Sequence, residues 1–376
     1  MTRRIFTVGD PAPWFSCRSS NSSEFHFGTT AGRYLVLCFY GSASIRKNAR
    51  VINYLTKELR HFFDDEKIAF FGVSIDNQDE QLARVSQILP GIRYFWDFNG
   101  QVSLLYGAIA PEQELTQGQI AYNSFTLVLS PLLRVMANIP LTDPDRHNET
   151  ISKILSELPP VNDYAGVPLH APVLIVPRIF ERSFCRQLIE LYEKNGGSES
   201  GFMREKDGNT VGVVDYSFKR RQDYYLDHDS VNDEICAAIR AKIVRRLVPE
   251  IEKAYQYKVT RMERYVIACY DGEIGGFFRP HRDNTTKGTA HRRFACTINL
   301  NTEEYEGGDL RFPEFGRATY RAPTGGAVVF SCSLLHEATP VTKGTRYAFL
   351  PFLYDDESAQ IRQENSVFLT GEIIRS

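Results

Sequence analysis

Paired cysteines are the first feature that this 376-residue sequence lacks. Its seven cysteines are odd in number and dispersed, and no two of them form a CxxC pair. This pattern argues against a disulfide framework and against a CxxC redox motif. Several cysteines, such as Cys38, lie in apolar, strand-like runs where buried free thiols are common. We therefore expect reduced thiols and a cytoplasmic location.

Strong net charge and long apolar segments are also missing. The formal charge balance is 44 − 46 = −2, which gives no general electrostatic basis for binding nucleic acid. No apolar run is long enough to span a bilayer. A secretory signal is not expected, because Gly9, Asp10 and Pro11 come before any apolar stretch. The sequence therefore predicts neither nucleic acid nor membrane as a partner.

The composition that is present suits an ordinary globular protein. Hydrophobic residues make up 43% and charged residues 24% of the sequence, which allows sizeable cores. The length favours two domains over one. A proline-rich segment, 159–172, is the best candidate for a linker. We place the boundary near residue 160, which gives domains 1–160 and 161–376.

The first half of the sequence alternates between strand-like and helix-like segments. Continuous apolar runs at 34–40 and 68–75 predict strands buried on both faces, and apolar residues at helical spacing predict a helix over 49–62. A second helix is expected over 78–89, followed by a hairpin within 124–136. Strands that alternate with helices predict an α/β layer fold.

The second half has a different pattern. Helices are expected over 182–194 and 231–255. From about residue 261 the sequence becomes a series of short strands separated by Gly, Pro and Asn turns, which predicts a β-sandwich or jelly roll. The expected strands are 265–270, 294–300, 309–312, 327–330 and 347–354.

Candidate metal ligands occur within this strand-rich half. His281 and Asp283 form an HxD motif, which on its own also fits a pair of solvated turn residues. His336 lies in an apolar run where an unpaired imidazole would be costly. Arg346 opens an otherwise apolar strand, where a buried guanidinium needs an anion. Two imidazoles and one carboxylate can occupy one face of an octahedral iron(II) and leave three positions open.

The motifs around these residues resemble the prolyl 4-hydroxylase-type branch of the iron(II)/2-oxoglutarate oxygenases, over about 177–356. The resemblance implies a double-stranded β-helix that hydroxylates an unactivated C–H bond and releases succinate and CO2. The matching motifs are Cys269-Tyr-Asp-Gly272, His281-Arg-Asp-Asn284, Glu306-Gly-Gly-Asp-Leu-Arg311, His336-Glu-Ala-Thr-Pro340 and Thr345-Arg-Tyr347.

The resemblance also implies the cofactors and their protein contacts. Iron(II) would be held by His281, Asp283 and His336, with 2-oxoglutarate as cosubstrate, O2 as the second substrate and ascorbate as a further candidate cofactor. Arg346, ten residues beyond His336, would be brought by a neighbouring strand to the distal carboxylate of 2-oxoglutarate. The carboxylate of Asp283 favours hydroxylation, because halogenating relatives carry a small residue at that position.

Two further contacts with the cosubstrate are suggested by the same resemblance. Tyr270 matches a tyrosine that lies against the cosubstrate, and it also fits a buried strand aromatic. Asn299 stands where relatives often carry a second tyrosine. Its amide can still donate a hydrogen bond, and the alternative is a residue in a strand-end turn.

The substrate stays open at the level of the sequence. Arg279 and Arg282 flank the first ligand, and Lys219-Arg220-Arg221 falls where relatives form a mobile lid. A basic lid would favour an anionic substrate, whereas the alternative is a solvated charged face of a hairpin. A prolyl residue, another protein residue and a small metabolite are all compatible with the sequence, as is a homodimer through either domain.

The first domain is similar to the peroxiredoxins, which have a thioredoxin fold, over about residues 5–140. The similarity rests on 8–15 and on the two buried strands. The loop after the first of these strands contains Ser42 and Ser44, whereas a peroxidase needs a thiolate there. Cys38 is expected to be buried, and Cys17, a candidate exposed thiol, lies in the wrong element. We expect a degenerate domain without peroxidase activity.

Three interpretations follow for the whole chain. The first is an iron(II)/2-oxoglutarate hydroxylase fused to a degenerate redoxin domain. The second is a thiol-based redox protein, against which the missing cysteine counts. The third is a non-catalytic module that binds 2-oxoglutarate or metal, and the retention of three candidate ligands together with Arg346 counts against it.

Overall fold

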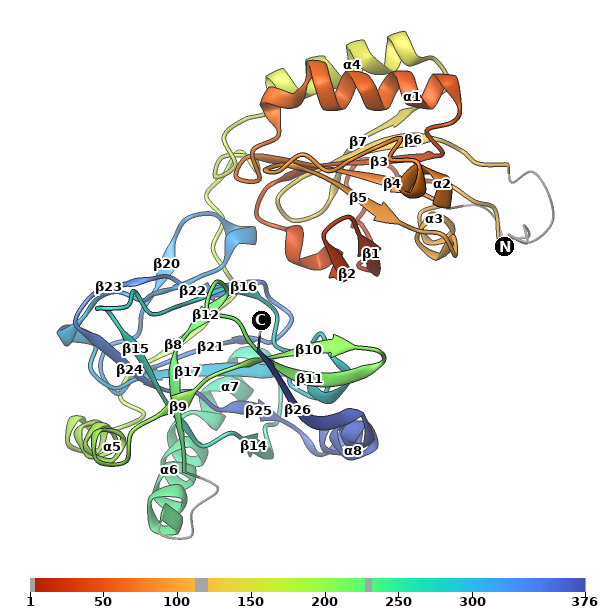
Figure 1. Cartoon of the computed structure of the whole chain (residues 1–376). Helices are drawn as coiled ribbons and strands as arrows, with labels where there is room; N and C mark the ends of the chain where they lie inside the picture. Colours follow the sequence, from red (N-terminus) through yellow and green to blue (C-terminus); the bar gives the residue numbers. More distant parts are fainter. Residues whose placement is uncertain (1–3, 112–120, 227–231, 376) are drawn as a thin grey trace. The chain divides into compact units, whose positions relative to one another are not determined.

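The computed structural model describes residues 4–111, 121–226 and 232–375. The chain forms two compact units (Figure 1): residues 1–170 with 313–316, and residues 171–312 with 317–376. The domain boundary near residue 160, which the linker position suggests, stays a prediction. In the part of the chain that the structure describes, no helix combines the length and the apolar character needed to cross a membrane.

A seven-stranded sheet forms the centre of the first unit, in the order β2-β1-β5-β4-β3-β6-β7. The strands β3, β4 and β5 pair in parallel, and the other pairs are antiparallel. Every residue of β3, β4 and β6 is buried, as the continuous apolar runs predict. The strands are β1 (Ser16–Ser19), β2 (Ser22–His26), β3 (Tyr34–Gly41), β4 (Ile68–Ser74), β5 (Ile92–Trp96), β6 (Phe125–Leu129) and β7 (Val135–Pro140).

Two helices cover one face of this sheet. Figure 1 shows α1 (Arg46–Asn53) and α4 (Pro144–Glu157) lying together on the same side. Their apolar residues join one hydrophobic cluster with the residues of β3 that face them, Cys38 included. Two short helices, α2 (Asn77–Gln81) and α3 (Gln101–Leu105), complete the unit. The expected α/β fold with a hairpin at its end is confirmed.

The helix boundaries differ from those expected from the sequence. The helix predicted over 49–62 is α1 followed by a π turn and a 3-10 turn. The helix predicted over 78–89 is wrong beyond Gln81, because Ala83 has a positive φ of 48° and the chain leaves the helix. The sequence pattern also predicts a short helix near 151–158, and α4 begins earlier than that, because Asp143 accepts hydrogen bonds from Asp145 N and Arg146 N and caps the helix.

Two antiparallel sheets form the second unit. The larger runs β14-β25-β17-β24-β15-β13-β9, with β21 on β17 and β8 on β21, and the smaller runs β12-β16-β22-β19-β20. The larger sheet contains β8 (Leu174–Val176), β9 (Ser198–Glu199), β13 (Gln222–Tyr225), β14 (Arg261–Glu263), β15 (Val266–Asp271), β17 (Phe294–Asn299), β21 (Ala327–Ser331), β24 (Thr345–Phe349) and β25 (Phe352–Tyr354). The smaller contains β12 (Lys219–Arg220), β16 (Phe277–His281), β19 (Leu310–Arg311), β20 (Thr319–Tyr320) and β22 (His336–Ala338).

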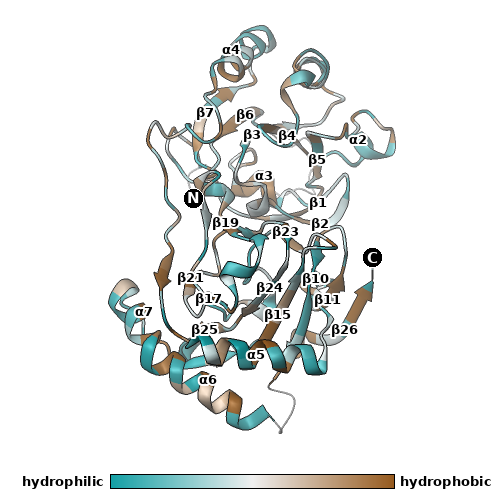
Figure 2. Ribbon diagram, turned by 90° about the vertical axis from the view of Figure 1, so that its left-hand side faces the viewer, coloured by the Kyte–Doolittle hydropathy of each residue, from teal (hydrophilic) through white to brown (hydrophobic). Residues whose placement is uncertain are grey.

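The larger sheet is covered differently on its two faces. One face packs against α5 (Arg182–Asn195), α6 (Asp233–Arg246) and α7 (Val248–Tyr255), which carry both hydrophilic and hydrophobic segments (Figure 2). The other face joins a cluster with residues of β16 and β22 in the smaller sheet. This arrangement confirms the jelly roll with supporting helices. The predicted helix over 231–255 is interrupted at Leu247, before Pro249, and its first residue lies outside the described residues.

Smaller elements complete the unit. The strands β10 (Phe202–Lys206) and β11 (Asn209–Val214) form a hairpin. The strand β26 (Leu369–Arg375) pairs with β11 in parallel and completes a three-stranded sheet. A two-stranded ladder joins β18 (Glu306–Gly307) to β23 (Val341–Lys343), and α8 (Asp356–Glu364) follows β25.

Candidate metal and cosubstrate site

Three candidate ligands meet at the ends of two neighbouring strands. His281 ends β16, His336 begins β22, and the two are direct cross-strand partners. Asp283 follows His281 by two residues and lies 3.6 Å from it, Oδ1 to Nε2. Its Oδ2 lies 3.3 Å from Nε2 of His336. The three ligand atoms thus lie within 4.8 Å of one another, as the sequence pattern predicts.

Backbone groups orient each of these side chains. Nδ1 of His281 lies 2.8 Å from the carbonyl oxygen of Arg279, and Nδ1 of His336 lies 3.0 Å from that of Leu334. A ring that donates from Nδ1 to a carbonyl keeps the lone pair of Nε2 available for a metal. The backbone N–H of Asp283 donates to the carbonyl of Cys332 at 3.0 Å and fixes the loop.

The electrostatics favour the protonation states that bind metal. Burial, together with the nearby His336, lowers the pKa of His281 to about 4. Burial raises the pKa of Asp283, but the two histidines outweigh burial and hold it well below its usual range. At neutral pH the first imidazole is therefore neutral and the carboxylate is ionised, which are the forms that ligate a cation.

Arg346 lies in the facing sheet, not on a neighbouring strand of the same sheet. It is 2% exposed and belongs to β24, which pairs with β15 and β17, whereas His336 belongs to β22. The sequence predicts only that a neighbouring strand carries this residue, and the structure places that strand in the facing sheet. Its guanidinium lies 4.8 Å from the ring centre of Tyr270, its cross-strand partner. The ring of Tyr270 thus stabilises the Arg346 guanidinium through a cation–π contact.

A small, narrow cavity lies beside Arg346. Residues of β17, β19, β20, β21 and β24 line it, and β19 is the direct neighbour of β22, which carries His336. Nε of Arg346 has no hydrogen-bond partner within the described part of the chain. A Cβ on Gly308 would lie 3.0 Å from Cδ of Arg346, so this glycine keeps the space beside the arginine open. A buried guanidinium with an unused donor at a cavity fits the carboxylate of a cosubstrate.

Asn299 also lines the cavity. It is 2% exposed, its Nδ2 donates to the carbonyl of Ala322 at 2.8 Å, and its Oδ1 has no partner among the described residues. The structure therefore places it beside Arg346, in a buried strand and not in an exposed turn. Tyr305 also lines the cavity and was missed by sequence reasoning. Its position close to the Gly-Gly turn at 307–308 is the signal that could have found it.

A buried cluster of basic groups lies behind Tyr270. Arg221 donates to the Tyr270 hydroxyl at 3.2 Å and to both carboxylate oxygens of Asp223 at 2.7 Å. Lys219 donates to Ser200 Oγ at 2.7 Å, and burial together with Arg221 lowers its pKa well below the usual value. A solvated charged face is therefore wrong for Lys219 and Arg221, which are 4% and 9% exposed. These basic side chains form a fixed internal network.

The arginines that flank His281 have different environments. Arg279 is exposed, donates from Nε to the carbonyl of Ser217 at 3.4 Å, and lies over the ring of Phe277 at 5.0 Å. Arg282 is 6% exposed and donates to the carbonyl of Ser333. Arg279 is thus available at the surface near the metal ligands, whereas Arg282 stabilises the ligand loop.

The first unit carries hydroxyl groups where a peroxidase would carry its thiolate. Ser42, just before α1, donates to Asp76 Oδ2 at 2.6 Å and lies 2.7 Å from Ser44 Oγ. Burial raises the pKa of both Cys17 and Cys38 to about 12. Cys38 is buried as expected, and Cys17 is half-buried and contacts the carbonyl of Trp96. Neither thiol is activated.

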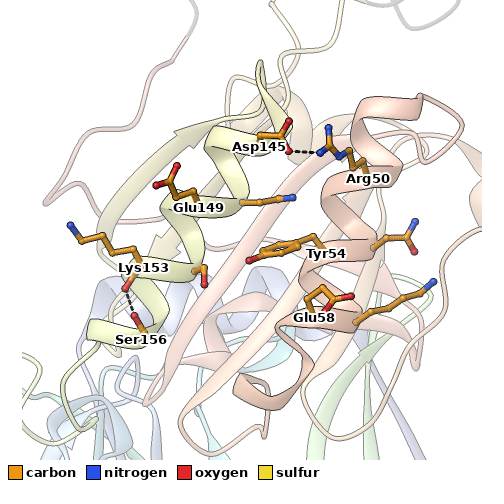
Figure 3. A pocket seen from close by; sticks show the side chains of 11 residues that line it. Arg50, Tyr54, Glu58, Asp145, Glu149, Lys153 and Ser156 are labelled. Carbon is orange, nitrogen blue, oxygen red and sulfur yellow. Dashed lines mark hydrogen bonds and ion pairs between the residues drawn. The ribbon is translucent and has the colours of Figure 1, made fainter.

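An open groove lies between α1 and α4 in the first unit (Figure 3). Both acidic and basic side chains line it, and an ion pair between Arg50 and Asp145 crosses it. Mixed charges and the lack of enclosure distinguish this groove from the more enclosed cavity beside Arg346.

Comparisons with known proteins agree with this division of the chain. Residues 265–354 match the family model of the 2OG-Fe(II) oxygenase superfamily, and residues 8–128 match that of the AhpC/TSA family. A PKHD-type hydroxylase from Shewanella baltica is 30% identical over 185 residues, which cover 44% of this chain and 77% of the relative. A PKHD-type hydroxylase from a Synechococcus strain is 32% identical over 89 residues, which span 22% of this chain and only 39% of that relative.

Solved structures with similar regions include members of both classes. A prolyl hydroxylase from Trichoplax adhaerens, in complex with a hypoxia inducible factor peptide fragment, aligns with a TM-score of 0.40 and 17% identity, covering 57% of this chain and 96% of that chain. A peroxidoxin from Mycobacterium tuberculosis aligns with a TM-score of 0.33 and 17% identity, covering 41% of this chain and 99% of that chain.

These matches define an oxygenase domain joined to a peroxiredoxin-like domain. Because the Shewanella baltica hydroxylase is matched over most of its length, the chain belongs to the 2OG-Fe(II) oxygenase superfamily.

Proposed function

We propose that the chain is an iron(II)- and 2-oxoglutarate-dependent dioxygenase that hydroxylates a C–H bond. The observation that carries this proposal is the pairing of two sites in one domain. His281, Asp283 and His336 present two imidazole nitrogens and a carboxylate to one point. Arg346 presents an unused donor to a cavity whose wall includes a strand next to the ligands. Neither feature alone defines an oxygenase, but the two together match its requirements.

Each residue has a separate task in this proposal. His281, Asp283 and His336 would hold iron(II), and their backbone hydrogen bonds keep Nε2 and the carboxylate facing the metal. Arg346 would bind the distal carboxylate of 2-oxoglutarate, and Tyr270 would hold the guanidinium in place. When bound, iron, 2-oxoglutarate and O2 supply the oxidation that hydroxylates the substrate and forms succinate and CO2. Ascorbate would serve as an accessory reductant.

The substrate of this reaction is proposed to be a protein residue or a small molecule with a negative charge nearby. Exposed Arg279 lies two residues before His281 and provides positive charge next to the candidate ligands. Lys219 and Arg221 do not contribute a surface charge, because they are buried. Neither nucleic acid nor membrane is proposed as a partner.

The first unit is proposed to act without redox chemistry. The thiols of Cys17 and Cys38 stay protonated at neutral pH, and hydroxyl groups occupy the loop before α1. We propose that the first unit either recruits the substrate or mediates dimerisation. Because all seven cysteines are free thiols, we propose a reducing compartment, the cytoplasm, as the location.

Anaerobic titration with iron(II) and then with 2-oxoglutarate tests the proposal. The expected result is a weak visible charge-transfer band from the chelated cosubstrate, and it should disappear in His336→Ala. Asp271→Asn, which changes a carboxylate outside the site, is the matched control and should retain the band. Folded protein that shows no band would remove the oxygenase function. A band without succinate formation on any substrate would leave a binding module instead.

A further inference from the structure

The cavity beside Arg346 is surrounded by three polar atoms that the chain does not use. They are Oδ1 of Asn299, the hydroxyl of Tyr305 and Nε of Arg346, and none has a partner within the described residues. The three residues are only 2%, 5% and 2% exposed. A buried polar group without a partner costs roughly 1–3 kcal/mol, so three of them around one cavity indicate a ligand.

The hydroxyl of Tyr305 is the neutral donor in this set. Oδ1 of Asn299 is an acceptor, and its amide nitrogen already donates to the carbonyl of Ala322. An acceptor cannot bind a carboxylate oxygen, whereas a phenol can donate to one. Arg346 and Tyr305 flank the same residue, because a Cβ on Gly308 would lie 3.0 Å from Cδ of Arg346 and 3.5 Å from Cε2 of Tyr305. The side chains that carry the charged donor and the neutral donor therefore both pack against Gly308, and both line the same cavity.

Tyr305 is also held rigidly. The guanidinium of Arg321 lies 4.5 Å from the centre of its ring. The same guanidinium donates to the carbonyl oxygens of Tyr305 at 3.2 Å and Gly307 at 2.5 Å, and to the carboxylate of Asp309. Arg321 thus joins the turn that carries Tyr305 to β20, and the phenol is fixed before any ligand arrives. A donor fixed in advance loses little entropy on binding.

We propose that Tyr305 binds the distal carboxylate of 2-oxoglutarate together with Arg346 and so determines selectivity for a dicarboxylate. This inference rests on the proposed function. Asn299 contributes its side chain to the wall of the cavity, and Tyr305 supplies from the turn before β18 the hydroxyl that residue 299 lacks.

Tyr305→Phe tests this role because it removes a single oxygen atom. Dissociation constants are measured anaerobically on the iron(II)-loaded protein with two probes, 2-oxoglutarate and pyruvate, of which pyruvate lacks the distal carboxylate. We expect the affinity for 2-oxoglutarate to fall roughly 10- to 100-fold, the strength of a hydrogen bond to a charged group. The affinities for pyruvate and for iron(II) should stay unchanged. Tyr257→Phe, a half-buried tyrosine outside the cavity, is the matched control and should bind both probes normally.

Three results would overturn the inference. Unchanged binding of 2-oxoglutarate by Tyr305→Phe would show that the hydroxyl does not contact the cosubstrate. Equal weakening of both probes would show that Tyr305 only maintains the shape of the site. If wild-type protein loaded with iron(II) binds neither probe, the proposed function fails and this inference fails with it, whereas the first two results leave the proposed function intact.

Discussion

His281 and His336 face each other across β16 and β22, with ring centres 4.3 Å apart, and each bonds the carbonyl oxygen two residues before it. This repeated local geometry points both Nε2 atoms at Asp283. Backbone carbonyl groups orient both imidazole rings. The orientation of the two candidate histidine ligands therefore depends on the backbone at the strand ends and not on extended side-chain networks.

Replacing His281 or Asp283 by Ala should abolish turnover and leave the fold intact. Loss of a direct ligand should weaken iron(II) binding by more than the roughly 10- to 100-fold expected for a residue that only orients a ligand. Iron affinity, succinate release and the circular dichroism spectrum are the measurements. Turnover at the wild-type rate in either variant would show that the metal is held elsewhere.

Arg346→Ala should raise the requirement for 2-oxoglutarate without changing iron affinity. Truncating one partner of a buried charge pair costs about 2–5 kcal/mol, which is at least tenfold in affinity. Arg346→Lys retains the charge but loses the planar fork and should bind with intermediate affinity. The dissociation constant for 2-oxoglutarate is measured with iron(II) present. If wild type and Arg346→Ala bind 2-oxoglutarate with equal affinity, a residue other than Arg346 binds its distal carboxylate.

Acid sensitivity should depend on Glu263. This carboxylate is 7% exposed and bonds His291 at 3.0 Å, Arg292 at 2.7 Å and Arg362 at 3.3 Å. Burial raises its pKa, but the hydrogen bonds from His291 and the charge of Arg292 outweigh burial and bring it to about 2, below the ordinary 4.5.

A lowered carboxyl pKa stabilises the folded state above the ordinary pKa and loses this effect as the pH falls through about 2. The contribution at pH 7 is roughly 3 kcal/mol. Glu263→Gln should therefore be less stable than wild type at pH 7, and the difference should shrink below pH 4. Urea unfolding of metal-free protein at pH 7 and pH 3 measures it, with exposed Glu252→Gln as the control. A difference that is constant with pH would contradict the ion-pair account.

Peroxide reduction should be absent and should not depend on Cys17 or Cys38. With the pKa of each thiol raised to about 12, almost no thiolate is present at pH 7. Wild type, Cys17→Ser and Cys38→Ser should consume hydrogen peroxide at the same background rate. Faster consumption by wild type than by either variant would support a thiol-based redox function.

The sequence predicts that the candidate ligands His281, Asp283 and His336 lie together, because residue types and their order carry this information. Apolar runs around His336 and Arg346 predict burial directly, and both are buried. The sequence does not predict that Arg346 comes from the facing sheet, because strand pairing over long separations is not encoded locally. The same limit hides the role of Lys219 and Arg221. Charged residues are buried only when partners such as Ser200 and Tyr270 reach them, and these distant partners are defined by tertiary structure.

Tyr305 and the helix expected over 78–89 show two further limits. Tyr305 reaches the cavity because Gly307 and Gly308 both have positive φ, and a turn of this kind places its neighbours in ways that periodicity does not describe. In the predicted helix the apolar spacing is present, but Leu82 and Leu89 are 63% and 53% exposed. Periodicity indicates a helix only where one face becomes buried.

If 2-oxoglutarate binds at Arg346 as proposed, the unused donor of this residue makes the stability of the protein depend on the concentration of the cosubstrate. A buried guanidinium whose Nε the chain leaves without a partner reduces the stability of the folded state, and an anion that satisfies it restores that stability. A ligand at 100 times its dissociation constant adds about 2.7 kcal/mol to the free energy of unfolding. Scarcity of the dicarboxylate would then remove protein through unfolding and proteolysis, in addition to slowing each turnover.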